Sequence, residues 1–267
     1  MSDDGCTVTW WGHATVDIRM DGTRVLTDPL LRRRIGPLHS RGHRPDRREA
    51  VESLSSIDAV LLSHLHHDHT DLPSVRRLGP RTTTVVPVGA EELLRRHARG
   101  PVIGLAVGSQ APMRGVRIQA TEARHDGTRH RGHVAEAVGY LVSGSRTVYF
   151  AGDTEIFAGM ADIADTSPGG IDVALLPVSG WGLTLGSGHM DEAAAAQAVR
   201  LLRPRIAVPI HWGTLRIPVA WRLRRKHLRG VAERFAALVA EAAPSTMVVV
   251  PEPGAAIGVP SRAEARP

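Results

Sequence analysis

The chain has 267 residues, enough for one large domain or two small ones with a buried core. Its hydrophobic content of 42% is ordinary for a globular protein, and no apolar run reaches the roughly 18 residues that a membrane span needs. The N-terminus has no signal-peptide pattern, and the lone cysteine, Cys6, cannot form an internal disulfide. We therefore expect a cytoplasmic protein without a membrane span.

The net charge of +6 comes almost entirely from arginine, because Lys226 is the only lysine. Together with abundant alanine, glycine and proline, this is as typical of a GC-rich coding sequence as of a protein that binds polyanions. Arginines gather at 32–34, 41–48 and 222–229, where each block is either a solvated face or a rim that attracts anions. We expect a small-molecule substrate, anionic if a block forms such a rim, rather than nucleic acid.

The first elements along the chain are predicted to be strands. Residues 7–28 alternate apolar and polar side chains, and Asp21-Gly22 is a strong signal for a tight turn between two antiparallel strands. The returning strand ends at Asp28, which precedes a proline. The segment 32–48, rich in arginine, glycine and proline, has no periodicity, and we expect it to form a rim or lid over a site.

The segment 57–71 organises the rest of the chain. A buried strand is predicted at 59–62, and four histidines and an aspartate follow Ser63 within six residues: His64, His66, His67, Asp68 and His69. Thr70 or Asp71 can then cap a helix that carries Pro73 in its first turn. His64 and His66 can aim at one metal ion, while Asp68 and His69 are better placed for a second. Imidazole and carboxylate suit zinc, iron or manganese.

Strands and helices continue to alternate beyond this segment. Strands are predicted at 82–88, 102–107, 115–121, 137–142, 147–151, 171–177, 205–210 and 246–250, and helices at 71–78, 90–99, 191–202 and 220–241. This order favours an α/β sandwich of two sheets with outer helices. We expect a single domain over 1–251, and a disordered tail over 252–267 because proline, alanine and glycine dominate there.

The run from His64 to His69 resembles the H-x-H-x-D-H signature of the metallo-β-lactamase superfamily. The segments 11–15, 26–29, 151–154 and 209–214 look like the branch that contains N-acylphosphatidylethanolamine-hydrolysing phospholipase D and the ascorbate-6-phosphate lactonase-like proteins. The match runs from about Val8 to about Pro218. The resemblance implies a four-layer αβ/βα sandwich with its metals at one edge of the sheets.

The resemblance also implies a ligand set for two divalent ions, zinc before manganese or iron. One ion would take His64, His66 and His125, the other Asp68, His69 and His211, with Asp153 bridging them. His125 competes with His130 and His133 and is preferred because it directly follows a predicted strand. A hydroxide shared by the ions would be the nucleophile.

Other polar residues are candidates for supporting roles. Asp28, predicted beside the metals, could orient a ligand imidazole and joins Asp68 and His189 as a catalytic candidate. His189 either touches the substrate or caps a helix at the surface, and His13 is either a packed histidine or a supporting group. His67 is predicted to face away as a spacer.

The function expected from these residues is that of a metal-dependent hydrolase acting on an ester, lactone or phosphodiester. A metallo-nuclease whose arginines track phosphates is the first alternative, although no aromatic residues suited to base stacking accompany the basic stretches. A diiron redox protein is the second. A purely structural metal site is the third, and seven candidate ligands exceed what a structural zinc requires.

Overall fold

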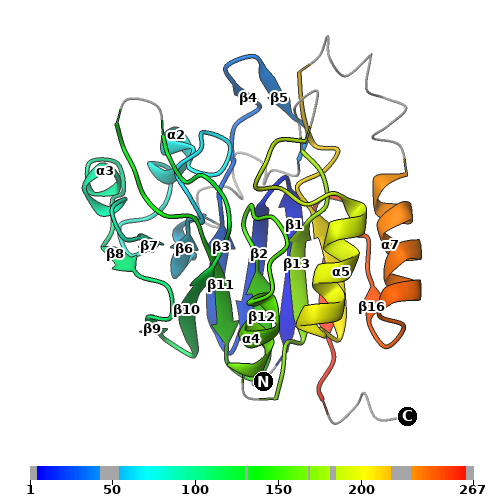
Figure 1. The fold of residues 1–267 in the computed structure, drawn as a ribbon. Coiled ribbons are helices and arrows are strands. Elements are labelled where there is room, and N and C mark those ends of the chain that lie inside the picture. The colour runs from blue at the N-terminus through cyan, green and yellow to red at the C-terminus, as the bar shows by residue number, and fades with distance from the viewer. Residues whose placement is uncertain are drawn as a thin grey trace.

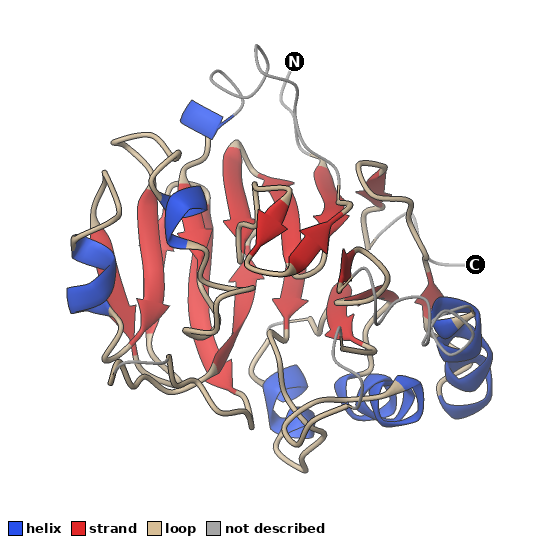
Figure 2. Ribbon diagram, turned by 90° about the horizontal axis from the view of Figure 1, so that it is seen from above, coloured by secondary structure: helices blue, strands red, loops and turns tan. Residues whose placement is uncertain are grey.

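The computed structural model describes residues 5–42, 54–129, 132–167, 169–180, 185–217 and 230–262. Within these residues, two seven-stranded sheets pack face to face, and helices cover both outer faces (Figure 1 and Figure 2). The protein is therefore the α/β, four-layer αβ/βα sandwich that the sequence predicts.

The first sheet has the strand order β17-β1-β2-β3-β6-β7-β8. Its strands β1, β2 and β3 are antiparallel, whereas β6, β7 and β8 continue parallel to β3. Asp21 and Gly22 connect β2 to β3 with φ of 51° and 68°, the positive values that a tight hairpin turn needs. The bounds are β1 Cys6–Gly12, β2 Thr15–Met20, β3 Thr23–Thr27, β6 Ala59–Leu61, β7 Thr83–Pro87, β8 Val102–Leu105 and β17 Ala256–Val259.

The second sheet has the order β16-β14-β13-β12-β11-β10-β9 and repeats this pattern of pairing. Strands β9 to β12 are antiparallel, and β13, β14 and β16 continue parallel to β12. Each sheet thus begins with hairpins and ends with parallel strands. The bounds are β9 Gln110–Met113, β10 Val116–Glu122, β11 Val138–Ser143, β12 Thr147–Phe150, β13 Val173–Pro177, β14 Ile206–Ile210 and β16 Met247–Val248.

Alternation along the strands explains the layers. Val25 and Phe150 face the core between the two sheets, whereas their neighbours Leu26 and Tyr149 face the helices. The first sheet carries α2 Leu72–Val75 and α3 Glu91–Arg95, and the second carries α4 Met160–Asp165, α5 Glu192–Leu202 and α7 Val231–Ala242. None of the described helices combines the length and apolarity required to cross a membrane. The first part of the helix predicted at 220–241 lies outside the described residues.

A small third sheet lies above one edge of the sandwich (Figure 1). It consists of β4 Arg34–Ile35, β5 Leu38–Ser40 and β15 Leu215–Arg216. Ile35, Leu38 and Leu215 form a hydrophobic cluster under it with Leu30. The predicted loop 32–48 is therefore a hairpin in its first part, and residues 43–48 lie outside the described residues.

The C-terminal segment corrects the sequence prediction of a tail from residue 252. Strand β17 pairs antiparallel with β1, and Arg262 binds the buried Asp172 at 2.7 Å. The strand was missed because its four residues, Ala-Ile-Gly-Val, carry little local β signal and are held by pairing with a distant part of the chain. Residues 263–267 lie outside the described residues.

Candidate metal centre

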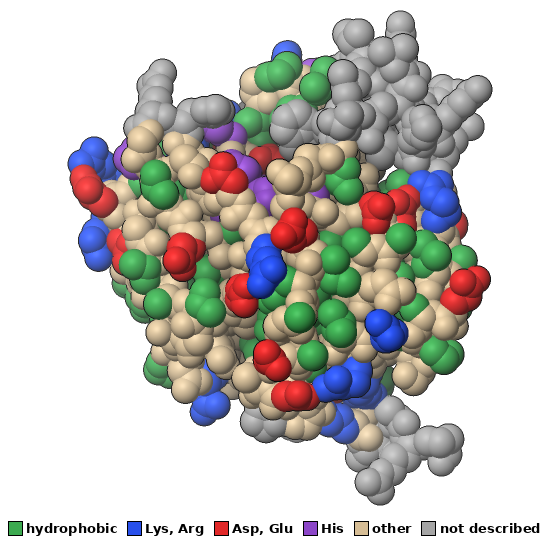
Figure 3. Space-filling model, viewed as in Figure 1, with side chains coloured by type: hydrophobic (Ala, Val, Ile, Leu, Met, Phe, Trp, Pro, Cys, Tyr) green, Lys and Arg blue, Asp and Glu red, His purple; other side chains and the backbone are tan. Residues whose placement is uncertain are grey.

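Histidines and carboxylates from loops that follow several strands meet at one edge of the sandwich. Figure 3 shows histidine side chains gathered near the upper end of the molecule, toward the side of β4 and β5. The loop after β6 contributes His64, His66, Asp68 and His69, while His125 follows β10, Asp153 follows β12 and His211 follows β14. These residues, far apart in the sequence, therefore lie together, as the prediction requires.

The first group consists of His64, His66 and His125. One ring nitrogen from each lies within 4.8 Å of the others. Nε2 of His125 is 3.1 Å from Nδ1 of His66. His64 is fully buried, whereas His66 and His125 are half-buried and face the exterior side of the site.

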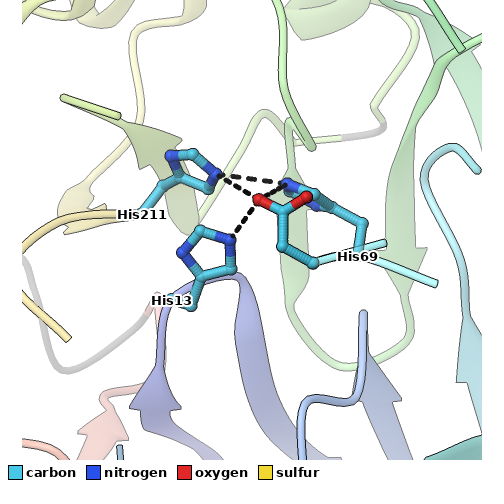
Figure 4. Close-up of side chains that lie close together, drawn as sticks. His13, His69 and His211 are labelled. Atoms are coloured by element: carbon cyan, nitrogen blue, oxygen red, sulfur yellow. Dashed lines mark hydrogen bonds and ion pairs between the residues drawn. The ribbon is translucent and has the colours of Figure 1, made fainter. Parts of the chain in front are cut away.

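The second group consists of Asp68, His69 and His211, together with His13, and all four are buried. Nε2 of His69 is 3.1 Å from Nε2 of His211, and Oδ2 of Asp68 is 3.7 Å from Nε2 of His69. Figure 4 shows the three rings pointing toward a common point. Nε2 of His13 is 3.0 Å from Oδ2 of Asp68, which places this histidine at the centre, within reach of the same position as the other three residues.

Asp153 lies between the two groups. Its Oδ2 is 3.1 Å from Nε2 of His69 and 3.3 Å from Nε2 of His211. It also shares a set with His64 and another with His125. Its Oδ1 is buried and has no hydrogen-bond partner among the described residues, so this oxygen is available to a ligand in the centre.

The ring orientation of three histidines is fixed by acceptors behind them. Nδ1 of His69 donates to Asp28 at 2.7 Å, Nδ1 of His211 to the carbonyl of Ser179 at 2.7 Å, and Nδ1 of His125 to the carbonyl of Gly188 at 2.8 Å. A neutral imidazole that donates from Nδ1 carries a lone pair on Nε2. In all three rings that lone pair is directed into the centre.

His64 reaches the same state through Ser63. The Ser63 hydroxyl donates to Asp28 at 2.6 Å, so it accepts from Nδ1 of His64 at 3.0 Å. Nε2 of His64 is then a buried lone pair with no partner. Leaving such an acceptor without a partner is costly in a protein interior unless a ligand meets it.

The distances fit metal ions between these atoms. Lone pairs 3.1 Å apart, as on His69 and His211, repel each other unless a cation lies between them. Ligand atoms on a tetrahedral ion with bonds of about 2.0–2.1 Å are roughly 3.4 Å apart, close to the observed spacing. Imidazole and carboxylate donors without thiolate match zinc, manganese or iron. The residues present therefore fit divalent ions.

The protonation states of His125, His211 and Asp153 agree with this fit. Burial alone would lower the pKa of His69, but Asp153 and Asp68 hold it well above its usual value, so an ion at this position would replace a proton. Burial lowers the pKa of His125 to about 4 and that of His211 to about 3, although Asp153 opposes the shift in both. Burial alone would raise the pKa of Asp153, but His211 and His69 hold it well below its usual range. At neutral pH these two rings are neutral and the carboxylate is charged, which are the states that bind metal.

Asp28, a catalytic candidate from the sequence, is fully buried and does not line the cavity that opens onto the centre. It accepts from the backbone and hydroxyl of Ser63 and from His69, and burial raises its pKa. Its place behind the rings of His69 and His64 is that of an orienting residue. Its φ of 31° reflects the turn that brings the carboxylate under both rings.

His189 lies beside the centre and is not a surface cap. Its Nε2 is 3.3 Å from Oδ2 of Asp153, and its Nδ1 is 3.2 Å from the carbonyl oxygen of Gly186. The hydrogen bond to Asp153 raises the pKa of His189. The cap of α5 is instead Asp191, which accepts from the backbone of Ala194.

A cavity of about 760 Å³ opens onto the centre. The side chains that line it include Asp68, Asp153, His66, His189 and His211 from the centre, the apolar Ile35, Pro37, Leu38 and Leu185, and the basic Arg32 and Arg129. This is the size and mixture typical of a small-molecule site.

One prediction about the cavity needs correction. His67 does not face away as a spacer, because it lines the cavity and its Nδ1 accepts from Arg129 at 2.9 Å. In the rim, Arg32 rather than the exposed Arg33 and Arg34 reaches the cavity, and it is bound to Asp71 at 2.9 Å. The direction of the His67 side chain depends on how the loop after β6 turns, and the spacing of residues in the sequence does not predict that turn.

His130 and His133 are the alternatives to His125 as a candidate ligand. His133 pairs through its backbone with Arg129 and belongs to none of the metal-binding groups among the described residues. His130 lies outside the described residues.

The fold and the two groups of ligands define a class, the metal-dependent hydrolases of the metallo-β-lactamase fold. A family model described as the beta-lactamase superfamily domain matches residues 23–212. The chain belongs to the metallo-β-lactamase superfamily.

Known proteins that are similar to this chain support the same family. A UPF0173 metal-dependent hydrolase of Thermofilum pendens is 31% identical over 252 residues, covering 91% of this chain and 94% of the relative. Another from Myxococcus xanthus is 31% identical over 259 residues, covering 93% and 81%. The structure of Igni18, a metallo hydrolase from Ignicoccus hospitalis, has the same fold, with a TM-score of 0.74, 24% identity and coverage of 97% of this chain and 100% of that one.

Proposed function

We propose that the enzyme uses two divalent ions, one held by His64, His66 and His125 and the other by Asp68, His69 and His211, with Asp153 between them. The observation that carries the proposal is the convergence of fixed lone pairs, because Nε2 of His69 and of His211 lie 3.1 Å apart while both Nδ1 atoms are engaged as donors. A metal ion between these atoms would relieve that contact without breaking either outer hydrogen bond, and it would replace the proton that His69 otherwise carries.

Bound ions would polarise the scissile group and lower the pKa of water to near neutrality, which supplies a nucleophile. The chain itself contributes orientation. Asp28 holds His69 and, through Ser63, His64, so two rings of different groups share one support. His189 lies in the cavity wall beside Asp153, where it can donate a hydrogen bond to an oxygen of the substrate.

The substrate class that we propose is a small ester, lactone or phosphodiester, hydrolysed in the cytoplasm. A cavity of about 760 Å³ suits such a molecule, and its apolar wall at Ile35, Pro37 and Leu38 suits a nonpolar portion. The segments 11–15, 26–29, 151–154 and 209–214 support a place in the branch that resembles the phospholipase D and lactonase-like proteins.

Metal analysis followed by a substrate screen tests the proposal. Protein purified without chelator is expected to contain two equivalents of zinc, manganese or iron, and to hydrolyse members of one substrate series, lactones or phosphodiesters, well above the metal-free protein. A fully active protein with no transition metal would refute the metal centre. A metal-loaded protein inactive on esters, lactones and phosphodiesters alike would refute the substrate class.

A further inference from the structure

Arg129 is a buried cation that forms no ion pair among the described residues. The carboxylate that acts on it at longer range, Asp71, is already bound to Arg32. It is 8% exposed and lines the cavity that opens onto the metal centre. The described part of the chain places no carboxylate within 4.0 Å of its guanidinium group. The other arginine of the cavity wall, Arg32, differs in this respect because it is bound to Asp71 at 2.9 Å.

The partners of Arg129 are all neutral. One terminal nitrogen donates to the carbonyls of Leu65 at 3.0 Å and Thr70 at 2.8 Å, and the other donates to Nδ1 of His67 at 2.9 Å. A guanidinium group has five N–H donors, so two of them have no partner among the described residues. Burial lowers the pKa of Arg129, yet a guanidinium group stays charged in proteins.

The three hydrogen bonds fix the guanidinium group beside the centre. The carbonyls of Leu65 and Thr70 belong to the loop that carries the four candidate ligands after β6, so Arg129 is held against that loop. Since arginine cannot accept a hydrogen bond, Nδ1 of His67 must be unprotonated. The cation is thus preorganised at the wall of the cavity rather than free to move into water.

A buried charge without a counter-ion is expensive to maintain, and a planar fork of donors matches a carboxylate or a phosphate group. We infer that Arg129 binds an anionic group of the substrate, a carboxylate or phosphate, while another part of the same molecule reacts at the metal centre. The part of this inference that concerns the reaction rests on the proposed function. The part that concerns anion binding does not, because Arg129 is not among the proposed metal ligands.

Binding to the metal-free protein tests the anion site separately from catalysis. After chelation and dialysis, calorimetry would measure three probes of similar size: phenyl phosphate, benzoate and neutral benzamide. We expect wild-type protein to bind at least one of the anions about tenfold or more tightly than benzamide. The anion that binds more tightly identifies the group. Equal binding of all three probes by wild-type protein would overturn the inference whatever the variants do.

Variants then assign the binding to Arg129. Arg129→Gln should remove the preference for the anion, whereas Arg129→Lys, which keeps a charge and can still reach a carbonyl, should retain most of it. Arg33→Gln removes an exposed arginine outside the cavity wall and should leave the preference intact. If Arg129→Gln binds anions like wild type, the inference is wrong. Should that variant not fold, an Arg129→Lys protein that folds yet prefers benzamide would equally contradict it.

The same variants separate an anion site from a support of the metal loop. With metal restored, Arg129→Lys should keep both metal equivalents and a raised KM confined to anionic substrates. If Arg129→Gln and Arg129→Lys both lose metal and affect neutral and anionic substrates alike, Arg129 only braces the loop and the inference falls, while the proposed metal function stands. If wild-type protein binds anions as expected but holds no metal, the proposed function fails and the anion site stands.

Discussion

At the scale of single residues, the candidate centre is defined by what lies behind each imidazole. Asp28, Ser179 and Gly188 accept from Nδ1 of three rings, and Ser63 accepts from the fourth. These acceptors choose the tautomer, which in turn points a lone pair at the site of the ion. The chemistry of the centre therefore depends on residues that need never touch an ion.

Replacing Asp153 or His189 should separate a ligand from a helper. Asp153→Asn removes the negative charge that would let two cations lie close together, so we expect loss of metal from one or both positions and near-complete loss of activity. His189→Ala should keep the full metal content and fold while turnover falls by roughly 10²–10⁴-fold. Measuring both the metal content and the turnover rate of each variant distinguishes a ligand from a helper. Loss of metal from His189→Ala would make His189 a ligand instead.

Asp28→Asn should weaken metal binding without removing a ligand. The amide is neutral and holds His69 less firmly, so we expect metal affinity to fall by about 10–100-fold. Competition with a chromophoric chelator would measure it. Asp17→Asn is a matched control, because Asp17 is an equally buried carboxylate that binds Arg24 away from the centre. Equal metal affinity in Asp28→Asn and wild type would contradict the orienting role.

At the scale of elements, the metal loop is connected to the cavity rim through Asp71. This residue caps α2 by accepting from the backbone of Ser74, and it also binds Arg32 at the start of the rim. One buried carboxylate thus fixes the start of a helix and one wall of the cavity. The distance between the rim and the loop is set by this contact.

Asp71→Ala should therefore cost more than the loss of a helix cap. Removing a cap alone lowers the free energy of unfolding by about 0.5–2 kcal/mol. Asp191→Ala supplies that reference, because Asp191 caps α5 through Ala194 and forms no ion pair with an arginine in the described part of the chain. We expect a larger loss in Asp71→Ala, measured by urea denaturation. If the two variants lose the same stability, the contact with Arg32 contributes nothing.

Elements with local signals were predictable, and elements held by distant pairing were not. The Asp21-Gly22 turn, the cap of α2 and the strand before the metal loop each have a signal within a few residues, and the structure confirms all three. Strands β5, β15 and β17 have two to four residues and are stabilised by partners far along the chain, and the two-residue β4 pairs only with β5. A short strand of this kind carries too little periodicity to be recognised.

The candidate site divides in the same way. The spacing in the loop after β6 predicted four candidate ligands, and the resemblance to the metallo-β-lactamase superfamily implied the other three, at the ends of β10, β12 and β14. The structure brings all seven residues together. The direction of His67 and the role of Arg129 depend on how the loop turns and on which carbonyls it exposes, which no spacing encodes.

At the scale of the whole molecule, metal removal should lower thermal stability. The candidate ligands come from both sheets, so ions would bind the folded chain and not the unfolded one. A ligand present at 100 times its dissociation constant adds about 2.7 kcal/mol, which for a protein of this size corresponds to a shift of roughly 5–10 °C.

Scanning calorimetry before and after chelation would measure this shift. Zinc or manganese should restore the melting temperature, whereas calcium, which prefers oxygen ligands, should not. An unchanged melting temperature in protein shown to have lost its metal would argue that the ions do not hold the sheets together.

The unequal depth of the two groups has a consequence for how fast each position exchanges its ion. His69, His211 and Asp68 are buried, whereas His66 and His125 are half-buried and reachable from outside. An incoming chelator can displace the half-buried His66 and His125 one at a time, whereas in the second group it meets only the parts of Asp68 and His211 that line the cavity. On the proposed assignment, release should therefore be biphasic, with a labile ion at His66 and His125 and an inert one beneath it. When metal is scarce, the enzyme would then hold one ion in the second group, and binding of a second ion at His66 and His125 would restore activity.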